Sequence, residues 1–323
     1  MPKKIRKPLP IHQSCLYKIN SRKRLAEILF TTEKKLIAVV DGNNRYETFK
    51  VKKKDGAERP ISAPNIGLKI KQKRLASLLH GLAAPDYVMA PVKGRSYVDN
   101  AARHVGQKEF CLLDVANFFP SCTDKRVFWF FSTVLKCSRD VAAILTRLTT
   151  EKGCLPQGSP CSPALAYWSY CDMWDAINDI AVKGGCRLTL YADDITISAS
   201  THIRGSDVWA IKRKLERYGL AYKIEKERRI RDKPVPITGC ILRGDKLLLP
   251  NRQHKALAEV RAEMRNPNAP NRTKIRNRLR GRETQAKQIL GYHDRKEKAV
   301  TALEPNIAVI VKLPFEEGEV PWK

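Results

Sequence analysis

The chain has 323 residues, and 61 Lys and Arg against 33 Asp and Glu give it a formal net charge of +28 at pH 7. A hydrophobic content of 43% with 17 Gly and 19 Pro excludes a collagen-like chain or a disordered basic tail, and predicts a packed protein of two or three lobes. Neither a membrane span nor an apolar signal segment is apparent, and the nine cysteines form no C-x2-C pair. We therefore expect a cytoplasmic protein with reduced thiols, no zinc site and no membrane contact.

The positive charge is concentrated in two segments. Residues 1–74 carry 20 Lys/Arg and 6 Asp/Glu, and residues 251–300 carry 14 and 5, which gives +14 and +9. The stretch between them is nearly balanced and holds most of the long apolar segments. Two basic surfaces around a folded centre suit a cleft that grips a phosphate backbone. This arrangement favours nucleic acid as the partner over an anionic membrane surface or a merely well-solvated exterior.

Hydrophobic periodicity and turn residues predict a mixture of helices and strands. Helices are predicted at 21–30, 66–82, 96–104, 124–136, 139–151, 163–182, 206–219, 253–265 and 273–290. Strands are predicted at 45–51, 60–63, 110–115, 187–191, 195–198, 221–224, 235–241 and 246–249. The first two strands form a basic hairpin around Lys52–Lys54, and Ile66 and Ile70 belong to the expected apolar face of the second helix.

Three aspartates are the candidate catalytic residues. Asp114 ends an apolar strand, and Asp193 and Asp194 lie at the tip of a later hairpin. Carboxylates in cation-rich surroundings favour the ionised form, and hard divalent ions seek such oxygen ligands. Two Mg²⁺ ions held there would serve in-line phosphoryl transfer. An Asp-Asp pair is also ordinary hairpin-turn chemistry, so the pair alone leaves both interpretations open.

Three motifs in a fixed order resemble those of reverse transcriptases. The stretch Leu112–Phe119 contains an aspartate followed by an aromatic pair, Leu155–Pro160 has the sequence LPQGSP, and Tyr191–Asp194 has the sequence YADD. The resemblance implies an α+β right-hand polymerase. Its fingers would span residues 1–110 with part of 155–185, its ferredoxin-like palm residues 111–245, and its basic helical thumb with a C-terminal tail residues 246–323.

The resemblance also implies a role for each motif residue. Asp114, Asp193 and Asp194, with the backbone of Val115, would hold two Mg²⁺ ions, for which Mn²⁺ could substitute. The residues implied to bind the deoxynucleoside triphosphate are Arg59, Phe119, Gln157 and Tyr191. The Phe119 ring would lie under the sugar and disfavour a 2′-hydroxyl, and the Arg59 guanidinium would pair with the triphosphate.

Two further elements resemble those of bacterial retron reverse transcriptases. They are Asn100–His104, which matches NAxxH, and Ile237-Thr238-Gly239, which resembles VTG. The resemblance implies that Asn100, His104, Thr238 and Gly239 bind RNA. It also implies that the enzyme copies a cognate structured non-coding RNA, primed from a guanosine 2′-hydroxyl, into a branched RNA–DNA product. An effector protein of an anti-phage defence system, in the bacterial cytoplasm, is the implied partner.

Two alternatives remain open. The chain could be a group II intron-like or other bacterial reverse transcriptase, although Asn100–His104 and the short C-terminal region favour a retron enzyme. It could also be a non-catalytic RNA-binding scaffold, which the intact acidic motifs disfavour. The stretch 224–230 departs from the family pattern, which commonly has an Asn and a Lys-Thr pair there, and it receives no role.

Overall fold

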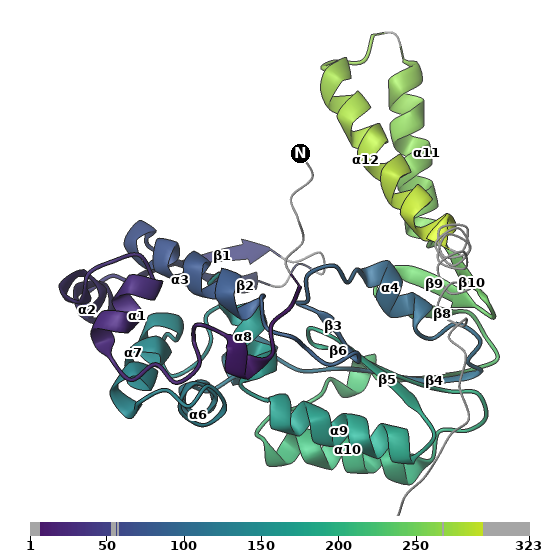
Figure 1. The fold of residues 1–323 in the computed structure, drawn as a ribbon. Helices are drawn as coiled ribbons and strands as arrows, with labels where there is room; N and C mark the ends of the chain where they lie inside the picture. Colours follow the sequence, from purple (N-terminus) through teal and green to yellow (C-terminus); the bar gives the residue numbers. More distant parts are fainter. Residues whose placement is uncertain (1–6, 53–55, 57, 267, 293–323) are drawn as a thin grey trace, which may run out of the picture.

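The computed structural model describes residues 7–52, 56, 58–266 and 268–292. The expected C-terminal tail and the turn residues Lys53 and Lys54 lie outside them. The structure is a mixture of helices and strands, as predicted, in which runs of helices and runs of strands follow one another (Figure 1).

The elements follow one another along the described chain with short connections. The helices are η1 (Ile11–Gln13), α1 (Arg22–Ile28), α2 (Glu33–Asp41), α3 (Ile66–Leu79), α4 (Tyr97–Ala102), α5 (Phe118–Ser121), α6 (Asp124–Trp129), η2 (Phe130–Val134), α7 (Arg139–Thr149), α8 (Ser162–Trp168), α9 (Cys171–Lys183), α10 (Gly205–Arg217), η3 (Ile224–Lys226), α11 (Asn251–Arg265) and α12 (Arg272–Leu290). The strands are β1 (Tyr46–Lys52), β2 (Glu58–Pro64), β3 (Val88–Ala90), β4 (Glu109–Asp114), β5 (Arg187–Tyr191), β6 (Asp194–Ala199), β7 (Arg228–Arg231), β8 (Val235–Ile237), β9 (Cys240–Arg243) and β10 (Lys246–Leu248).

A five-stranded sheet with the order β3-β5-β6-β4-β7 forms the centre of the molecule. Strands β5 and β6 form an antiparallel hairpin, β4 runs antiparallel to β6, and β3 runs parallel to β5. Helices α9 and α10 cover one face of this sheet (Figure 1). All but the first residue of β6 are buried, so both faces of the sheet are covered at this strand. The sheet is thus a rigid support for residues at its strand ends.

Helices α1, α2, α3 and α7 pack together beside the β1–β2 hairpin (Figure 1). The prediction that Ile66 and Ile70 lie on the buried face of α3 is wrong, because Ile66 is 80% exposed and Ile70 is 55% exposed. The buried stripe instead runs through Leu68, Gln72 and Leu75, which follow the helical repeat. Gln72 occupies a core position because its amide group is hydrogen-bonded on both sides.

A second, smaller sheet with the order β10-β9-β8 lies at the base of the α11–α12 hairpin (Figure 1). The α11–α12 hairpin projects away from the rest of the molecule (Figure 1). A separate apolar core joins this sheet to α4 and α12. Its buried members include Val98, Ala101, Phe110, Val235, Ile237, Leu242, Leu247, Ala286 and Ile289.

Three predicted elements differ in the structure. The predicted helix 163–182 is two helices, α8 and α9, because the buried Tyr170 leaves helical geometry to hydrogen-bond with Ser121 and Thr123. The predicted strand at 221–224 is one isolated bridge followed by η3, and the strand of this region is β7. The predicted strand 235–241 is divided into β8 and β9, because Thr238 and Gly239 have positive φ angles.

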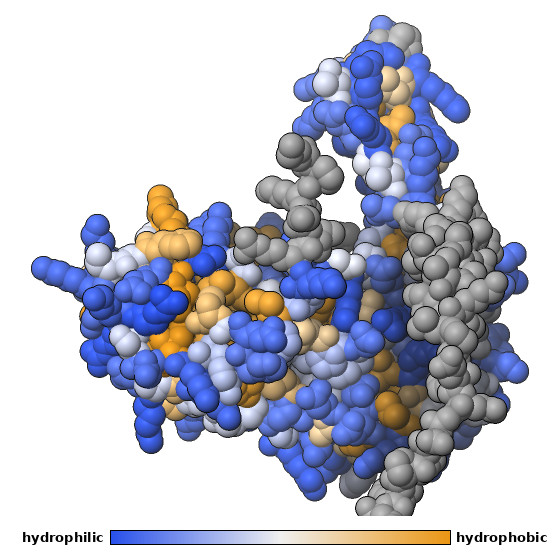
Figure 2. Space-filling view, viewed as in Figure 1, coloured by the Kyte–Doolittle hydropathy of each residue, from blue (hydrophilic) through white to orange (hydrophobic). Residues whose placement is uncertain are grey.

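The surface is mostly hydrophilic in the view of Figure 2, and the α11–α12 hairpin is especially so. Apolar side chains are more frequent over the N-terminal part of the molecule (Figure 2). Phe30, Phe49, Ile66 and Ile70 are among the exposed apolar residues of this part of the chain. Among the residues that the structure describes, none of the helices combines the length and hydrophobicity that a membrane span requires.

Candidate active site

The three candidate catalytic aspartates lie at one end of two paired strands. Asp114 is the last residue of β4, and its partner across the antiparallel ladder is Asp194, the first residue of β6. Asp193 precedes Asp194, and its carbonyl oxygen accepts the Val115 N–H at 3.0 Å. Strand pairing and a backbone hydrogen bond therefore fix the relative positions of all three residues.

The turn that carries Asp193 has a left-handed residue. Ala192 has a φ of 56° and lies between Tyr191 and Asp194, which pair as the last residues of the hairpin strands. Positive φ at a central residue gives a two-residue turn the twist that an antiparallel hairpin needs. The Ala192 N–H donates to the Ala90 carbonyl oxygen at 3.2 Å, which ties the turn to β3.

Burial and mutual repulsion raise the pKa of two of these aspartates. The pKa of Asp194 rises to about 6, first because burial penalises its charged form and then because Asp193 and Asp114 lie nearby. Burial is also the main reason that the pKa of Asp193 is raised, with the charge of Asp114 adding to the effect. The site therefore holds negative charge that a cation would stabilise.

Two lysines that the sequence analysis left without a role bind Asp114. The Lys226 ammonium donates to Asp114 Oδ2 at 2.6 Å, and the Lys223 ammonium donates to Oδ1. The backbone N–H of Lys223 also donates to the Asp114 carbonyl oxygen at 2.8 Å. This segment reaches the site because Tyr222 forms a β-bridge with Val115, a pairing that no local pattern reveals.

The donor chemistry of the site fits a hard divalent cation. Across residues 7–52, 56, 58–266 and 268–292, no three His, Cys, Asp or Glu side chains converge as a preformed metal site. Both Asp114 oxygens instead accept hydrogen bonds from the two lysine ammonium groups, which a bound ion would have to displace. Carboxylate oxygens are the ligands that Mg²⁺ and Mn²⁺ prefer. Asp114, Asp193 and Asp194 are therefore the residues that would hold such an ion, and Val115 is buried directly beside them.

Two of the predicted nucleotide-binding residues flank the aspartates in sequence. Phe119 is partly exposed in α5, and its ring lies against that of Phe118 with the centroids 5.9 Å apart. Phe118 is buried and also packs against Trp174, so only Phe119 of this aromatic pair remains accessible. Tyr191 is partly exposed at the end of β5.

The other two predicted nucleotide-binding residues belong to the β1–β2 hairpin and the loop beside it. Arg59 is exposed on β2, and the Ser62 N–H of the same strand donates to the Gln157 carbonyl oxygen at 2.7 Å. Gly158 lies so close to this strand that a Cβ atom would come within 2.7 Å of the Ser62 oxygen. Gln157 Oε1 is buried without a hydrogen-bond partner. This orphaned acceptor is the kind of group that a bound ligand satisfies.

The four residues predicted to bind RNA lie at α4 and the β8–β9 turn. Asn100 and His104 are both fully buried, with 0% exposure. Thr238 and Gly239 form the turn and are partly exposed. The structure brings Asn100 to Thr238, whose Oγ1 accepts the Asn100 Nδ2 hydrogen at 3.1 Å. His104 lies apart from this pair, between Ser198 and Thr189.

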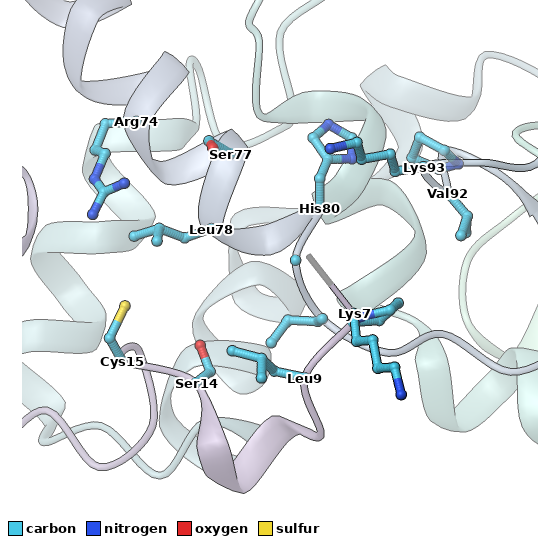
Figure 3. Close-up of a pocket in the computed structure, with 14 residues that line it drawn as sticks. Lys7, Leu9, Ser14, Cys15, Arg74, Ser77, Leu78, His80, Val92 and Lys93 are labelled. Atoms are coloured by element: carbon cyan, nitrogen blue, oxygen red, sulfur yellow. The ribbon is translucent and has the colours of Figure 1, made fainter. Parts of the chain in front are cut away.

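A pocket of about 1000 Å³ lies on another part of the molecule, between the segment before η1 and the end of α3 (Figure 3). Three cationic residues, Lys7, Arg74 and Lys93, lie around it, together with His80 and apolar side chains such as Leu78. None of its lining residues belongs to the acidic or nucleotide-binding motifs. Its charge suits an anionic partner.

Comparison with known proteins identifies related sequences. The family described as reverse transcriptase (RNA-dependent DNA polymerase) matches residues 51–242. The retron Se72 reverse transcriptase of Salmonella heidelberg is 31% identical over 164 residues, which are 50% of this chain and 43% of that protein. The retron Ec86 reverse transcriptase of Escherichia coli is 31% identical over 184 residues, 57% of each chain. The chain thus spans about half the length of these curated relatives.

A solved structure of a foamy viral protease-reverse transcriptase in complex with double-stranded DNA is also similar. It has a TM-score of 0.44 and 17% identity, over 88% of this chain and 45% of that one.

Proposed function

This chain belongs to the reverse transcriptase (RNA-dependent DNA polymerase) family, and on that premise we propose that it is a retron RNA-directed DNA polymerase. In this proposal its template is a cognate structured non-coding RNA. A guanosine 2′-hydroxyl of that RNA primes synthesis, so the single-stranded DNA product remains joined to it as a branched RNA–DNA molecule.

The pairing of Asp114 with Asp194, with Asp193 held beside them by the backbone hydrogen bond from Val115, carries the proposal. Nucleotide addition joins a primer hydroxyl to the α-phosphorus of a deoxynucleoside triphosphate and releases pyrophosphate, so negative charge concentrates where the bond forms. Divalent metal ions, which this family generally uses, neutralise that charge and activate the attacking hydroxyl when bound. In our proposal there are two Mg²⁺ ions, with Mn²⁺ as a substitute, held by Asp114, Asp193, Asp194 and the Val115 carbonyl.

The surrounding residues orient the nucleotide. Arg59 would pair with the triphosphate, since it is exposed on β2, the strand that lies against the Gln157 loop. Gln157 would direct its unpartnered Oε1 toward the incoming nucleotide. Phe119 and Tyr191 would bound the sugar, and the accessible ring of Phe119 would exclude a 2′-hydroxyl.

The lobes take the names of a right hand in this proposal. Residues 1–110 with part of 155–185 form the fingers, 111–245 the palm and 246–323 the thumb. The exposed lysines and arginines of the α11–α12 hairpin and of α3 supply the basic walls of the nucleic-acid cleft. The pocket between η1 and α3 adds a further basic surface for the RNA.

The retron assignment rests on two observations. Asn100–His104 and Ile237–Gly239 resemble the elements that mark retron enzymes, and the curated relatives with 31% identity are retron reverse transcriptases. An effector protein of a defence system and a bacterial cytoplasmic location complete the proposal.

Primer extension tests the polymerase part of the proposal. The purified protein is given a heteropolymeric RNA with an annealed DNA primer, Mg²⁺ and deoxynucleotides, and we expect full-length DNA. Asp193→Asn should abolish extension and leave RNA affinity within about twofold, because it removes a metal ligand without a large change in shape. Asp245→Asn, on an exposed turn, is the matched control and should extend normally. An active Asp193→Asn protein would refute the metal site, and RNA binding without extension by the wild type would favour the scaffold alternative.

A second experiment tests the retron part. Nucleic acid is isolated from the protein expressed with its native flanking DNA and examined for a branched RNA–DNA species. Such a species is expected to shorten after either RNase or DNase treatment, and to lose its RNA on debranching. Polymerase activity without any branched product would instead favour a group II intron-like or other bacterial reverse transcriptase.

A further inference from the structure

Helix α4 carries Asn100, and His104 lies in the turn just after it; the polymerase chemistry leaves both motif residues without a role. The helix begins at Ser96 with a capping box, in which Ser96 and Asp99 hydrogen-bond to each other's backbone N–H groups. It lies between the central sheet and the small β8–β10 sheet (Figure 1). A helix in this place contacts both the catalytic hairpin and the base of the thumb.

One side of the connection is made by His104. Its Nδ1 lies 2.6 Å from Ser198 Oγ on β6, and its Nε2 lies 2.7 Å from Thr189 Oγ1 on β5. These are the two strands that present Asp193 and Asp194. Both ring nitrogens are thus occupied by the catalytic hairpin, and the buried ring has no exposed surface for RNA.

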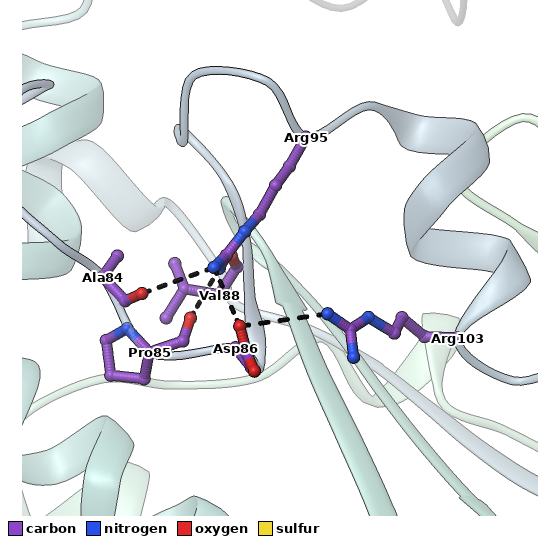
Figure 4. A network of polar contacts seen from close by, with 6 residues as sticks. All are labelled: Ala84, Pro85, Asp86, Val88, Arg95 and Arg103. Atoms are coloured by element: carbon purple, nitrogen blue, oxygen red, sulfur yellow. Dashed lines mark hydrogen bonds and ion pairs between the residues drawn. The ribbon is translucent and has the colours of Figure 1, made fainter. Parts of the chain in front are cut away.

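Two arginines lie on this side of the connection (Figure 4). Arg95 precedes α4, and its guanidinium donates to the carbonyl oxygens of Pro85 and Val88 and to the Asp86 carboxylate. Arg103 at the end of α4 lies 4.0 Å from the same carboxylate. Val88 begins β3, the parallel neighbour of β5, so Arg95 ties the segment before α4 to the sheet that carries the hairpin. The Arg103–Asp86 pair is exposed and adds little.

The other side of the connection is made by Asn100. Its Nδ2 donates to Thr238 Oγ1 at 3.1 Å, and the Thr238 hydroxyl donates to the Tyr97 carbonyl oxygen at 3.0 Å. From the first helix of the thumb, Gln253 Nε2 donates to the Gly239 carbonyl oxygen at 3.1 Å. The β8–β9 turn is therefore hydrogen-bonded to α4 on one side and to α11 on the other.

Apolar packing follows the same route. Val98 and Ala101 of α4 share a buried core with Ile237 of β8 and with Ala286 and Ile289 of α12. This core is separate from the larger one beneath the central sheet. A thumb attached through one small core and a few hydrogen bonds depends on each of them for its orientation.

We propose that α4 is a bracket that holds the thumb at a fixed orientation to the catalytic hairpin, with Asn100, His104 and Thr238 as positioning residues for polymerisation. The inference rests on the proposed polymerase function. The two retron-marking elements, Asn100–His104 and Ile237–Gly239, then contact each other and the thumb. The stability of the thumb's contact with the template–primer duplex depends on them.

Thr238→Val tests the bracket, because it removes the hydroxyl and both of its hydrogen bonds while it keeps the branched shape. On a heteropolymeric RNA with an annealed DNA primer and a heparin trap, we expect the number of nucleotides added per binding event to fall about fivefold, as the loss of two modest hydrogen bonds implies. The rate of the first nucleotide addition should stay within about twofold, because the aspartates do not move.

Three further variants make the test specific. Thr238→Ser keeps the hydroxyl and should restore wild-type processivity. Gln253→Met breaks the contact from the thumb side at a partly exposed position and should lower processivity in the same way. Thr284→Val is the matched control, because the Thr284 hydroxyl donates only to Arg280 within α12.

Hydrogen exchange provides a readout that needs no activity. In Thr238→Val, the amides of α11 and of the β8–β9 turn should exchange at least about threefold faster, with the β1–β2 hairpin unchanged. Wild-type processivity in Thr238→Val, or failure of Thr238→Ser to restore it, would overturn the bracket. If Thr238→Val weakened the binding of single-stranded RNA as much as it lowered processivity, while hydrogen exchange stayed unchanged, the bracket would be overturned. Direct contact between Thr238 and RNA would then explain the result. An inactive wild type would refute the polymerase, while the exchange experiment would still decide on the bracket.

Discussion

Lys223 is bound to Asp114 twice, through its backbone N–H to the carbonyl oxygen at 2.8 Å and through its ammonium group to Oδ1. Lys226, three residues later, occupies Oδ2 at 2.6 Å. A carboxylate that is expected to bind a metal ion is therefore already neutralised by two ammonium groups. Any divalent ion that binds Asp114 must compete with them, because like charges repel at short range.

Lys223→Met should strengthen Mn²⁺ binding to the protein in the absence of nucleotide. The substitution removes one competing ammonium, while the backbone bond of residue 223 remains. We expect a dissociation constant lower by about threefold to tenfold, the range for one partly solvated charge pair. Electron paramagnetic resonance of free Mn²⁺ measures it directly. Lys212→Met is the control, since Lys212 pairs with Glu227 instead of Asp114, and unchanged binding in Lys223→Met would show that no competition exists.

Phe119→Ala should relax sugar selection. The Phe119 ring is the accessible member of the aromatic pair, so its removal opens space for a 2′-hydroxyl. The ratio of kcat/KM for a deoxynucleotide to that for the ribonucleotide should fall at least about tenfold, which corresponds to roughly 1.4 kcal/mol. Phe118→Leu, at the buried ring, should lower the thermal midpoint without changing this ratio. An unchanged ratio in Phe119→Ala would show that Phe119 does not select the sugar of the nucleotide.

The motifs around Asp114, Gln157 and Asp193 could be predicted from the sequence because each is a short run whose chemistry is local. The contacts of Lys223 and Lys226 could not, because they join residues separated by 109 and 112 positions. Their position depends on a single β-bridge between Val115 and Tyr222. Long-range pairing of this kind leaves no periodic signal in the sequence.

Two errors in the predicted elements have a similar cause. Thr238 has a φ of 43°, a conformation that β-branched residues rarely adopt. The sequence of residues 235–241 therefore predicts one continuous strand, whereas the structure has a turn at Thr238. The turn is stabilised by hydrogen bonds to Tyr97 and Asn100, more than a hundred residues away. In α3, the sequence predicts that Ile70 is buried, whereas tertiary packing buries Gln72.

Gln72→Leu should weaken both stability and nucleotide binding. The Gln72 amide donates to Tyr46 Oη and to the Leu148 carbonyl oxygen, and its Oε1 accepts the Ser159 hydroxyl at 2.9 Å. It thereby links the β1–β2 hairpin to the loop that carries Gln157. We expect the free energy of unfolding to fall by about 2–4 kcal/mol, because buried partners lose their hydrogen bonds. KM for the deoxynucleotide should rise more than kcat falls.

Tyr46→Phe is the graded control, since it removes only one of these hydrogen bonds and should cost about 1 kcal/mol. Urea denaturation and steady-state kinetics measure the two effects. If Gln72→Leu lowered stability but left KM unchanged, the side chain would support the core without positioning the loop.

The double variant Arg276→Ala and Arg280→Ala should reduce the affinity for an RNA–DNA duplex. Both residues are exposed on one face of α12, four positions apart. If both contact phosphates, the slope of log affinity against log salt should become less steep by up to about two units. Arg278→Ala removes one charge instead of two, and Arg278 is already paired with Glu263 at 2.8 Å, so its effect should be less than half as large. Equal slopes in both variants would exclude this face of α12 as a nucleic-acid surface.

His104→Gln should make the protein's stability less sensitive to mild acid. Burial lowers the pKa of His104 to about 3, with Arg187 and Arg103 adding to the effect, whereas an unfolded histidine has a pKa near 6.5. Between these values the unfolded state binds a proton that the folded state does not, so stability falls as the pH drops from about 6.5 toward 3. The destabilisation caused by the substitution should therefore be about 2 kcal/mol smaller at pH 5 than at pH 7.5. Urea denaturation at both pH values measures this difference, and the exposed His254→Gln provides the control. A pH-independent effect of His104→Gln would mean that the folded ring has the same pKa as the unfolded histidine, so that it protonates in mild acid with Ser198 and Thr189 both accepting from it.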